Sequence, residues 1–235
     1  MKWGVNMRDI FVLVACEESQ RVCIAFRNRG FQAYSADIQE PSGGHPEWHI
    51  KGDVLPLLNG NCEFVTMDGV RHTIRQTWDL IIAHPPCTYL TNASAVRMRV
   101  NGVIVQDRWE KAMEAKEFFM AIYNARCEHI AIENPTPMKI IGLPNYTQAI
   151  QPYEHGHPYS KRTCLWIKNL PMIKPTKICY HHEPWVNGGS KNSDGSYRTF
   201  KGRNERDAKT RSKTFIGIAE AFSRQWGDFL HDTYK

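Results

Sequence analysis

A cysteine and a glutamate that each follow a predicted strand are the residues of this sequence best suited to chemistry. Cys87 comes after the apolar run 80–83 and the pair Pro85-Pro86, which cannot continue a strand. Glu133 ends a second apolar run, 128–132. If the two runs are neighbouring parallel strands, their ends meet at the edge where open α/β sheets bind ligands. We therefore expect a reactive thiol with a carboxyl partner; the alternative is a buried cysteine without a chemical role.

The first forty residues predict the opening of the sheet that must position these groups. Residues 9–15 and 31–38 are typical of buried strands, and residues 21–28 between them of a helix that ends at Gly30. This β-α-β order is typical of sheets that bind nucleosides or dinucleotides. Asp37, at the end of the second strand, is placed to bond ribose hydroxyls.

The turn after the first strand lacks the glycines of a phosphate-binding loop. Glu17 and Glu18 stand there instead, and two carboxylates disfavour a pyrophosphate because like charges repel. They suit a ligand whose nearby end is neutral or cationic, such as S-adenosylmethionine with its sulfonium and ammonium groups. The alternative is that both glutamates are solvated loop residues. Asp53, near a short third strand, either contacts an adenine amino group or caps a helix.

The rest of the chain predicts further elements around this sheet. The stretch 88–108, which contains Arg97 and Arg99, is irregular and long enough to be functional or mobile. Lys161 and Arg162 open a later strand. The other expected elements are a strand at 62–67, a short helix or turn at 70–77, an amphipathic helix at 109–125, an irregular stretch at 139–151, a strand at 161–167 and a final helix at 214–228.

Composition and charge narrow the possible partners. The 235 residues carry a formal net charge of +6, which permits a nucleic-acid or nucleotide partner without demanding one. No apolar run approaches the roughly 18–20 residues that span a bilayer, so we expect no membrane partner. The seven cysteines include no C-x-x-C pair, which favours reduced thiols in a cytoplasmic protein over a disulfide framework.

We expect one domain over 1–235, with an excursion at 170–213. The basic part of the excursion, 187–213, is either an arm along a phosphate backbone or a solvated loop. Cys179 and the pair His181-His182 lack a second ligand pair at zinc-finger spacing, so we predict no metal site.

The order of Pro85-Pro86-Cys87 and Glu133-Asn134-Pro135 on consecutive strands resembles the P-C and E-N-V motifs of the C5-cytosine DNA methyltransferases. The resemblance covers most of the chain and is closest to small methylase-like members encoded by bacteriophages. It implies an α/β fold with a Rossmann-like methyltransferase sheet, helices on both faces, and the excursion in place of a full target-recognition domain. The other similar segments are Val12–Ala15 with Asp37, Asp53, Ser160–Cys164 and Thr214–Ala221.

The resemblance also implies a role for each candidate residue. Cys87 would add to C6 of cytosine, Glu133 would bond the N3/N4 edge and lend a proton at N3, and Arg162 would hold O2 or a phosphate. A carboxyl beside a desolvated base can have a raised pKa, as this role of Glu133 requires. The implied contacts to S-adenosylmethionine are Glu17, Glu18, Asp37, Asp53 and Pro85, and those to the substrate are Asn134, Arg97, Arg99 and Lys161.

Three departures from the family pattern leave other functions open. The first motif reads Cys16-Glu-Glu-Ser-Gln20 in place of F-x-G-x-G-G, the last lacks its Gly-Asn pair, and Cys164 replaces the second arginine of R-x-R. The leading prediction is methylation of cytosine in duplex or single-stranded DNA, inside a bacterial or phage-infected cell. One alternative is an enzyme that modifies free pyrimidine nucleotides with the same thiol chemistry. The other is an inactive methyltransferase fold that binds nucleic acid or a nucleotide.

Overall fold

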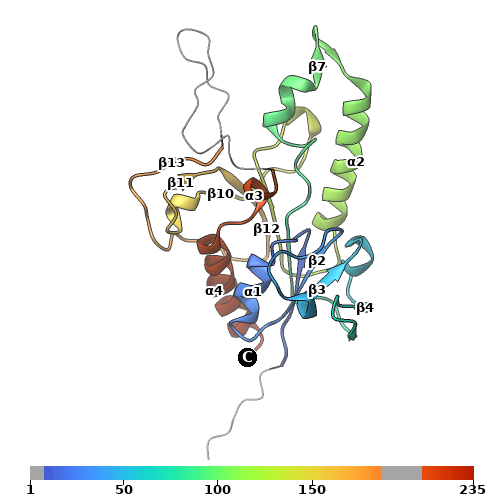
Figure 1. Cartoon of the computed structure of the whole chain (residues 1–235), viewed down its shortest axis with the longest axis vertical. Coiled ribbons are helices and arrows are strands. Elements are labelled where there is room, and N and C mark those ends of the chain that lie inside the picture. Colours follow the sequence, from blue (N-terminus) through green and yellow to red (C-terminus); the bar gives the residue numbers. More distant parts are fainter. Residues whose placement is uncertain (1–7, 187–207) are drawn as a thin grey trace, which may run out of the picture.

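A central sheet organises the computed structural model, which describes residues 8–186 and 208–235. Seven strands in these ranges form the sheet in the order β10-β12-β9-β6-β1-β2-β3 (Figure 1). Neighbours from β9 to β3 are parallel, whereas β12 runs antiparallel between β9 and β10. The expected α/β class is confirmed. The strands are β1 (Phe11–Ala15), β2 (Gln32–Asp37), β3 (His49–Lys51), β6 (Leu80–Ala83), β9 (Ile130–Asn134), β10 (Gln148–Ile150) and β12 (Thr163–Lys168).

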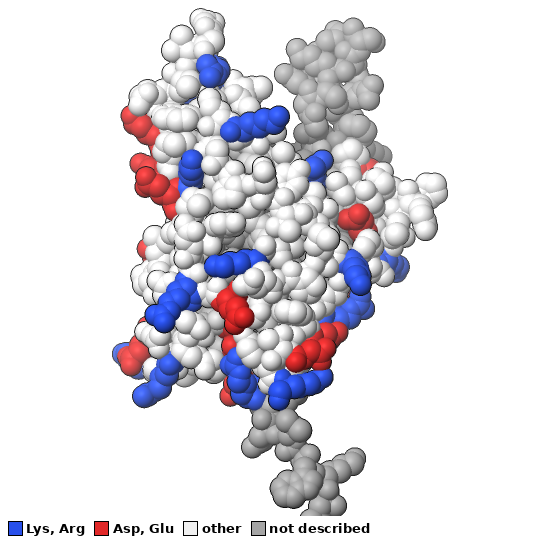
Figure 2. All heavy atoms as spheres, turned by 180° about the vertical axis from the view of Figure 1, so that it is seen from behind, with Lys and Arg blue, Asp and Glu red and all other residues white. Residues whose placement is uncertain are grey.

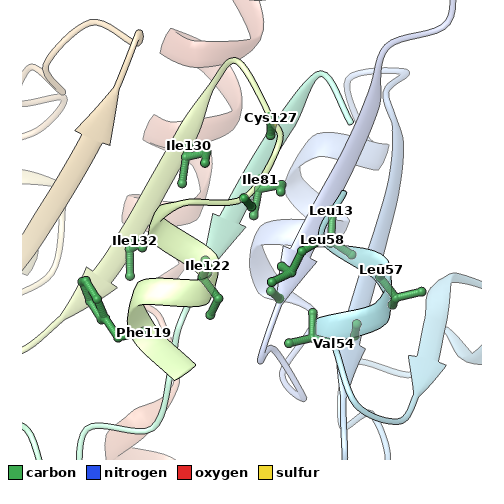
Figure 3. Packing of buried hydrophobic residues seen from close by; sticks show 14 of the residues in the cluster. Leu13, Val54, Leu57, Leu58, Ile81, Phe119, Ile122, Cys127, Ile130 and Ile132 are labelled. Carbon is green, nitrogen blue, oxygen red and sulfur yellow. The ribbon is translucent and has the colours of Figure 1, made fainter. Parts of the chain in front are cut away.

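Helices cover both faces of the sheet, because strands that are buried on both sides need cover on both. Helices α1 (Arg21–Arg27) and α4 (Ile216–Thr233) pack together on one face, and α2 (Gln106–Tyr123) lies on the other (Figure 1). Successive strand residues point to opposite faces and so feed two separate cores. Figure 3 shows the core under α2, where Phe119 and Ile122 approach Ile132 of β9.

Smaller elements surround the sheet. Three further strand pairs lie outside it: β4 (Cys62–Val65) with β5 (Arg71–Ile74), β7 (Arg99–Val100) with β8 (Val103–Ile104), and β11 (Tyr159–Ser160) with β13 (Glu183–Pro184). The short helices are α3 (Ala208–Ser212) and the 3₁₀ turns η1 (Pro46–Trp48), η2 (Leu55–Leu57), η3 (Asn92–Arg97), η4 (Lys139–Ile141) and η5 (Pro152–Glu154). No helix in 8–186 or 208–235 is both long and apolar enough to cross a membrane.

Two predictions made from the sequence are wrong in detail. The stretch 70–77 forms β5 instead of a short helix or turn, because it pairs with β4 and buries Ile74. The stretch 88–108 is not irregular throughout, since it contains η3 and the hairpin β7–β8. Asn101 and Gly102 both have positive φ at the tip of this hairpin, as a tight two-residue turn requires.

The two long helices were predicted at the right places, with shifted ends. Helix α2 begins at Gln106, three residues before the predicted start, and α4 continues to Thr233. The stretch 139–151 was expected to be irregular, but it contains η4 and the edge strand β10. Residues 187–207 of the predicted basic arm lie outside the described residues.

Candidate active site at the carboxyl edge of the sheet

The structure brings Cys87 and Glu133 to one edge of the sheet. Strands β6 and β9 are parallel neighbours, with Ala83 opposite Ile132, so the residues that follow them share this edge. Burial raises the pKa of the Cys87 thiol, and the nearby Glu133 carboxylate raises this pKa further, whereas Lys161 acts in the opposite direction. The expected meeting of a thiol and a carboxyl is therefore found.

His84 is a member of this site that the sequence analysis did not single out. Its Nδ1 lies 3.1 Å from Oε2 of Glu133. Both side chains are nearly buried, with 11% and 12% of their surface exposed. Its other ring nitrogen, Nε2, is buried and has no hydrogen-bond partner among the described residues. The sequence feature that could have indicated His84 is its position between a buried strand and the Pro-Pro-Cys turn.

Glu133 titrates below its ordinary range in this setting. Burial alone would raise its pKa, but the bond to His84 and the positive charges of Lys161 and His84 outweigh burial and lower it. The raised pKa that the resemblance implies for a carboxyl beside a bound, desolvated cytosine stays a prediction. The two cationic neighbours that favour the carboxylate, His84 and Lys161, come from other parts of the chain.

Asn134 ties the Pro-Pro-Cys turn to β9. It is 1% exposed, and its Nδ2 donates to the carbonyl of Pro85 at 2.9 Å. The carbonyl of Cys87 in turn accepts from the backbone N–H groups of Leu90 and Thr91, both at 3.1 Å. These three bonds hold the backbone around the thiol. The predicted substrate contact of Asn134 remains a prediction, and its buried Oδ1 has no hydrogen-bond partner within the described ranges.

Lys161 and Arg162 point to different surroundings. Lys161 is half-buried, its Nζ donates to the carbonyl of Arg211 at 3.0 Å, and its charge acts on both the thiol and Glu133. Arg162 is exposed and donates from Nη2 to the hydroxyl of Tyr146 at 2.7 Å. Consecutive residues of an extended chain face opposite sides, which explains the difference. The cation that acts on the thiol is therefore Lys161.

Glu17 is buried at the start of α1. It is 3% exposed, and its two carboxylate oxygens accept from the backbone N–H groups of Val22 at 2.6 Å and Cys23 at 3.1 Å. Burial raises its pKa to about 7, although His84, the two N–H groups and Arg21 oppose this shift. A helix N-terminus is where a phosphate would bind, and here a side chain of the protein fills it.

Glu18 connects the same turn to the end of the chain. It is 8% exposed, so the solvated-loop alternative is wrong for it as it is for Glu17. Its Oε2 accepts from Ser42 Oγ at 2.5 Å, and its Oε1 lies 3.6 Å from Nζ of Lys209 and 4.0 Å from Nζ of Lys213. These ion pairs hold α3 and the residues after it against the carboxyl edge.

Asp37 and Asp53 gather near the turn after β1. Asp37 ends β2 and accepts from the backbone N–H of Gln39 at 2.9 Å, and Asp53 accepts from the N–H of Leu55 at 3.0 Å. Asp53 does not cap η2, because the N-cap of this turn is Val54 and no side chain bonds to its first N–H groups from that position; the bond to Leu55 is a local turn, and the adenine contact of Asp53 remains a prediction. Burial raises the pKa of Cys16 to about 12, and both aspartates add to the shift, so both carboxylates lie close to this turn.

Arg97 and Arg99 lie at the surface, next to the start of α2. Both are exposed, and Arg99 donates to the carbonyl of Gly102 within the hairpin at 2.8 Å (Figure 1). On the face that Figure 2 shows, Lys and Arg are scattered among Asp and Glu and form no single basic patch in the described part of the chain. The substrate contacts assigned to both arginines stay predictions.

Cys179 and His182 are engaged in local contacts. The ring of His182 stacks on Tyr153 with centroids 4.0 Å apart, and its Nδ1 lies 3.3 Å from the carbonyl oxygen of Cys179. In the ranges that the structure covers, no group of three His, Cys, Asp or Glu side chains is placed to hold a metal ion.

Comparison with known proteins identifies no relative. No protein-family model matches the chain, and no curated protein matches it. The likeness to the C5-cytosine methyltransferases therefore rests on the motifs of the sequence.

Proposed function

We propose that the protein is an S-adenosylmethionine-dependent methyltransferase that acts on C5 of cytosine in DNA. The observation that carries the proposal is the meeting of Cys87 and Glu133 at the ends of the neighbouring strands β6 and β9. The fold is compatible with it as well, because the central sheet is mostly parallel and has helices on both faces, as the resemblance implies.

The residues around the turn after β1 fit S-adenosylmethionine better than a dinucleotide. Glu17 already fills the N-terminus of α1, which leaves no free anion site for a pyrophosphate. Asp37 ends β2, where an acid can bond ribose hydroxyls, and the proposal assigns the adenine amino group to Asp53; both carboxylates lie near the turn after β1. A ligand without phosphate and with a cationic end suits this acidic setting. When bound, it supplies an electrophilic methyl group.

The proposed chemistry assigns one task to each central residue. Carbon 5 of cytosine is a poor nucleophile, and addition of the Cys87 thiolate to C6 converts the ring into an enamine that is nucleophilic at C5. Glu133, as a carboxylate, accepts from the exocyclic N4 amino group and orients the ring. Lys161 favours the charged forms of both side chains. Loss of the C5 proton and departure of Cys87 then restore the aromatic ring.

A 5-fluorocytosine oligonucleotide tests the covalent step. Fluorine at C5 cannot leave as a proton, so we expect an adduct that survives denaturation and maps to the Cys87 peptide. Cys87→Ser should form no adduct and transfer no methyl group. Cys179→Ser, in a surface loop, is the matched control and should behave as the unaltered protein. Methyl transfer by Cys87→Ser at the original rate would refute the mechanism.

A free pyrimidine nucleotide is the second candidate substrate. The described parts of the 170–213 excursion lie against the sheet domain, through the β11–β13 pair and the contacts of Lys209 and Lys213 with Glu18. A free nucleotide needs no separate recognition domain. Tritium transfer from labelled S-adenosylmethionine to duplex DNA, single strands and dCMP, measured in parallel, separates the two substrates.

Calorimetry that detects DNA binding without cofactor binding would instead support the inactive fold. In each case we place the protein in the cytoplasm of a bacterial or phage-infected cell.

A further inference from the structure

We infer that His84 is the base that takes the proton from the Cys87 thiol, with its ring held in place by Glu133. The inference rests on the proposed function, because addition of a thiol to a pyrimidine ring needs the thiolate. The resemblance to the methyltransferases assigns no residue to this step. A histidine directly before the Pro-Pro-Cys turn supplies it.

The bond between His84 and Glu133 determines which ring nitrogen is available. A carboxylate can only accept, so Nδ1 of His84 carries the hydrogen that points to Oε2, 3.1 Å away. In the neutral ring, Nε2 then has a free lone pair. This atom is buried and has no hydrogen-bond partner in the described part of the chain. A carboxylate that orients an imidazole whose other nitrogen serves a nucleophile is the logic of a catalytic triad.

The Pro-Pro turn favours an arrangement in which the thiol and the imidazole share one side of the chain. Cys87 follows His84 by three residues, with Pro85 and Pro86 between them. Prolines favour the polyproline II conformation, in which residues three apart face the same side. The bond from Asn134 holds the carbonyl of Pro85 in place. The charge of Glu133 acts on the thiol as well, so the thiol lies near the His84–Glu133 pair. Because Nε2 has no partner among the described residues, Cys87 included, the side chain of Cys87 must turn toward the ring for the proton to pass.

The other groups around the thiol and the imidazole are poor bases. Glu133 is held as a carboxylate with a lowered pKa. Lys161 donates to a backbone carbonyl and acts as a cation. Glu17 has a pKa of about 7, but it acts on His84 and not on the thiol, and both its oxygens are bonded to backbone N–H groups of α1. Imidazole is the side chain that ordinarily exchanges protons near neutral pH.

Every proton in this step is accounted for. The S–H bond of Cys87 breaks and an N–H bond forms at Nε2 of His84, which gives a thiolate and an imidazolium. The carboxylate of Glu133 stabilises the imidazolium. At the end of the cycle, the thiolate leaves C6 and takes this proton back, while the proton lost from C5 passes to water.

Alkylation of Cys87 by iodoacetamide tests the inference without cofactor or DNA. The rate at each pH is read from the Cys87 peptide by mass spectrometry. His84→Asn keeps an N–H donor for Glu133 but has no atom in place of Nε2, so we expect alkylation near neutral pH to slow by about tenfold or more. His181→Asn, in a surface loop, is the matched control and should leave the rate unchanged. If His84 only positions Glu133, His84→Asn will behave as the unaltered protein, and the inference is overturned.

Two further measurements make the test decisive. Adding Glu133→Gln to His84→Asn should restore part of the alkylation rate. In the single variant Glu133 only repels the thiolate, and the second substitution removes that repulsion. Nitrogen-15 NMR of the intact protein should show that Cys87→Ser shifts the titration of the His84 ring, and an identical titration would overturn the inference even if His84→Asn does not fold. The two proposals can fail separately. If alkylation of His84→Asn is slow but the unaltered protein transfers no methyl group, the proposed function is refuted and the role of His84 as the base still stands.

Discussion

The pH dependence of stability should reveal the proton on Glu17. This carboxyl is buried against the first turn of α1, and its pKa lies at about 7 instead of the ordinary 4.5. The dominant cause is burial, which disfavours the charged form more than the surrounding donors favour it. Glu17→Gln replaces the carboxyl by an amide of the same shape that carries no charge at any pH.

The magnitude follows from the pKa difference. A shift from 4.5 to about 7 is 7 − 4.5 = 2.5 pH units. At about 1.4 kcal/mol per unit, this corresponds to about 3 kcal/mol, an order-of-magnitude value. Because the folded state binds the proton more tightly than the unfolded state, the contribution of Glu17 is complete below pH 4.5 and is lost as the pH rises to about 7.

Urea unfolding of both proteins at several pH values measures this effect. Near the lower pKa, the two free energies of unfolding should differ only by the constant effect of the substitution. At about pH 8, the free energy of unfolding of Glu17→Gln should have risen by about 3 kcal/mol relative to that of the unaltered protein. Glu117→Gln, in the exposed part of α2, controls for the exchange of a carboxylate for an amide. A difference between Glu17→Gln and the unaltered protein that does not change with pH would refute the reasoning.

Three further substitutions test close contacts in the fold. Asn134→Ala removes the donor to the carbonyl of Pro85, and we expect it to lower the free energy of unfolding by about 1–3 kcal/mol; unchanged urea unfolding would show that the bond is unimportant. Gly217→Ala would place its Cβ 1.9 Å from the carbonyl oxygen of His155, so we expect a lower melting temperature by calorimetry. Gly227→Ala meets side chains and not backbone, the ring of Phe31 at 2.9 Å and Nε of Arg29 at 3.4 Å, and should destabilise less.

The features that the sequence predicts well depend on local pattern. Strands β1 and β6 are continuous apolar runs, and β2 and β9 are largely buried, so their order along the chain suffices to expect Cys87 and Glu133 at one edge. The hairpin β4–β5 was missed because β5, Arg71–Ile74, is mostly polar and shows no strand pattern of its own. It forms a strand because it pairs with β4. Whether such a segment forms a strand depends more on its tertiary contacts than on its intrinsic strand propensity.

The features that the sequence does not predict depend on register and on long-range contact. Lys161 and Arg162 are adjacent cations, and a shift of one residue decides which of them faces the thiol. The pairing of β6 with β9 brings His84 to Glu133 from 49 positions away. Glu17 resembles a solvated glutamate in the sequence, and only the packing of α1 shows that it is buried.

Charges of alternating sign explain how one buried edge holds so many ionisable groups. Glu17 follows β1, His84 follows β6, Glu133 ends β9 and Lys161 precedes β12, and each acts on the next. A buried charge without a partner is expensive, whereas this order gives each carboxylate a cationic neighbour. Groups coupled in this way titrate as a set. Removing His84 therefore alters Glu17 and Glu133 together, so the effects of single substitutions at this edge will not add. The double variant of His84 and Glu133 is consequently the more informative measure of what either residue does to the thiol.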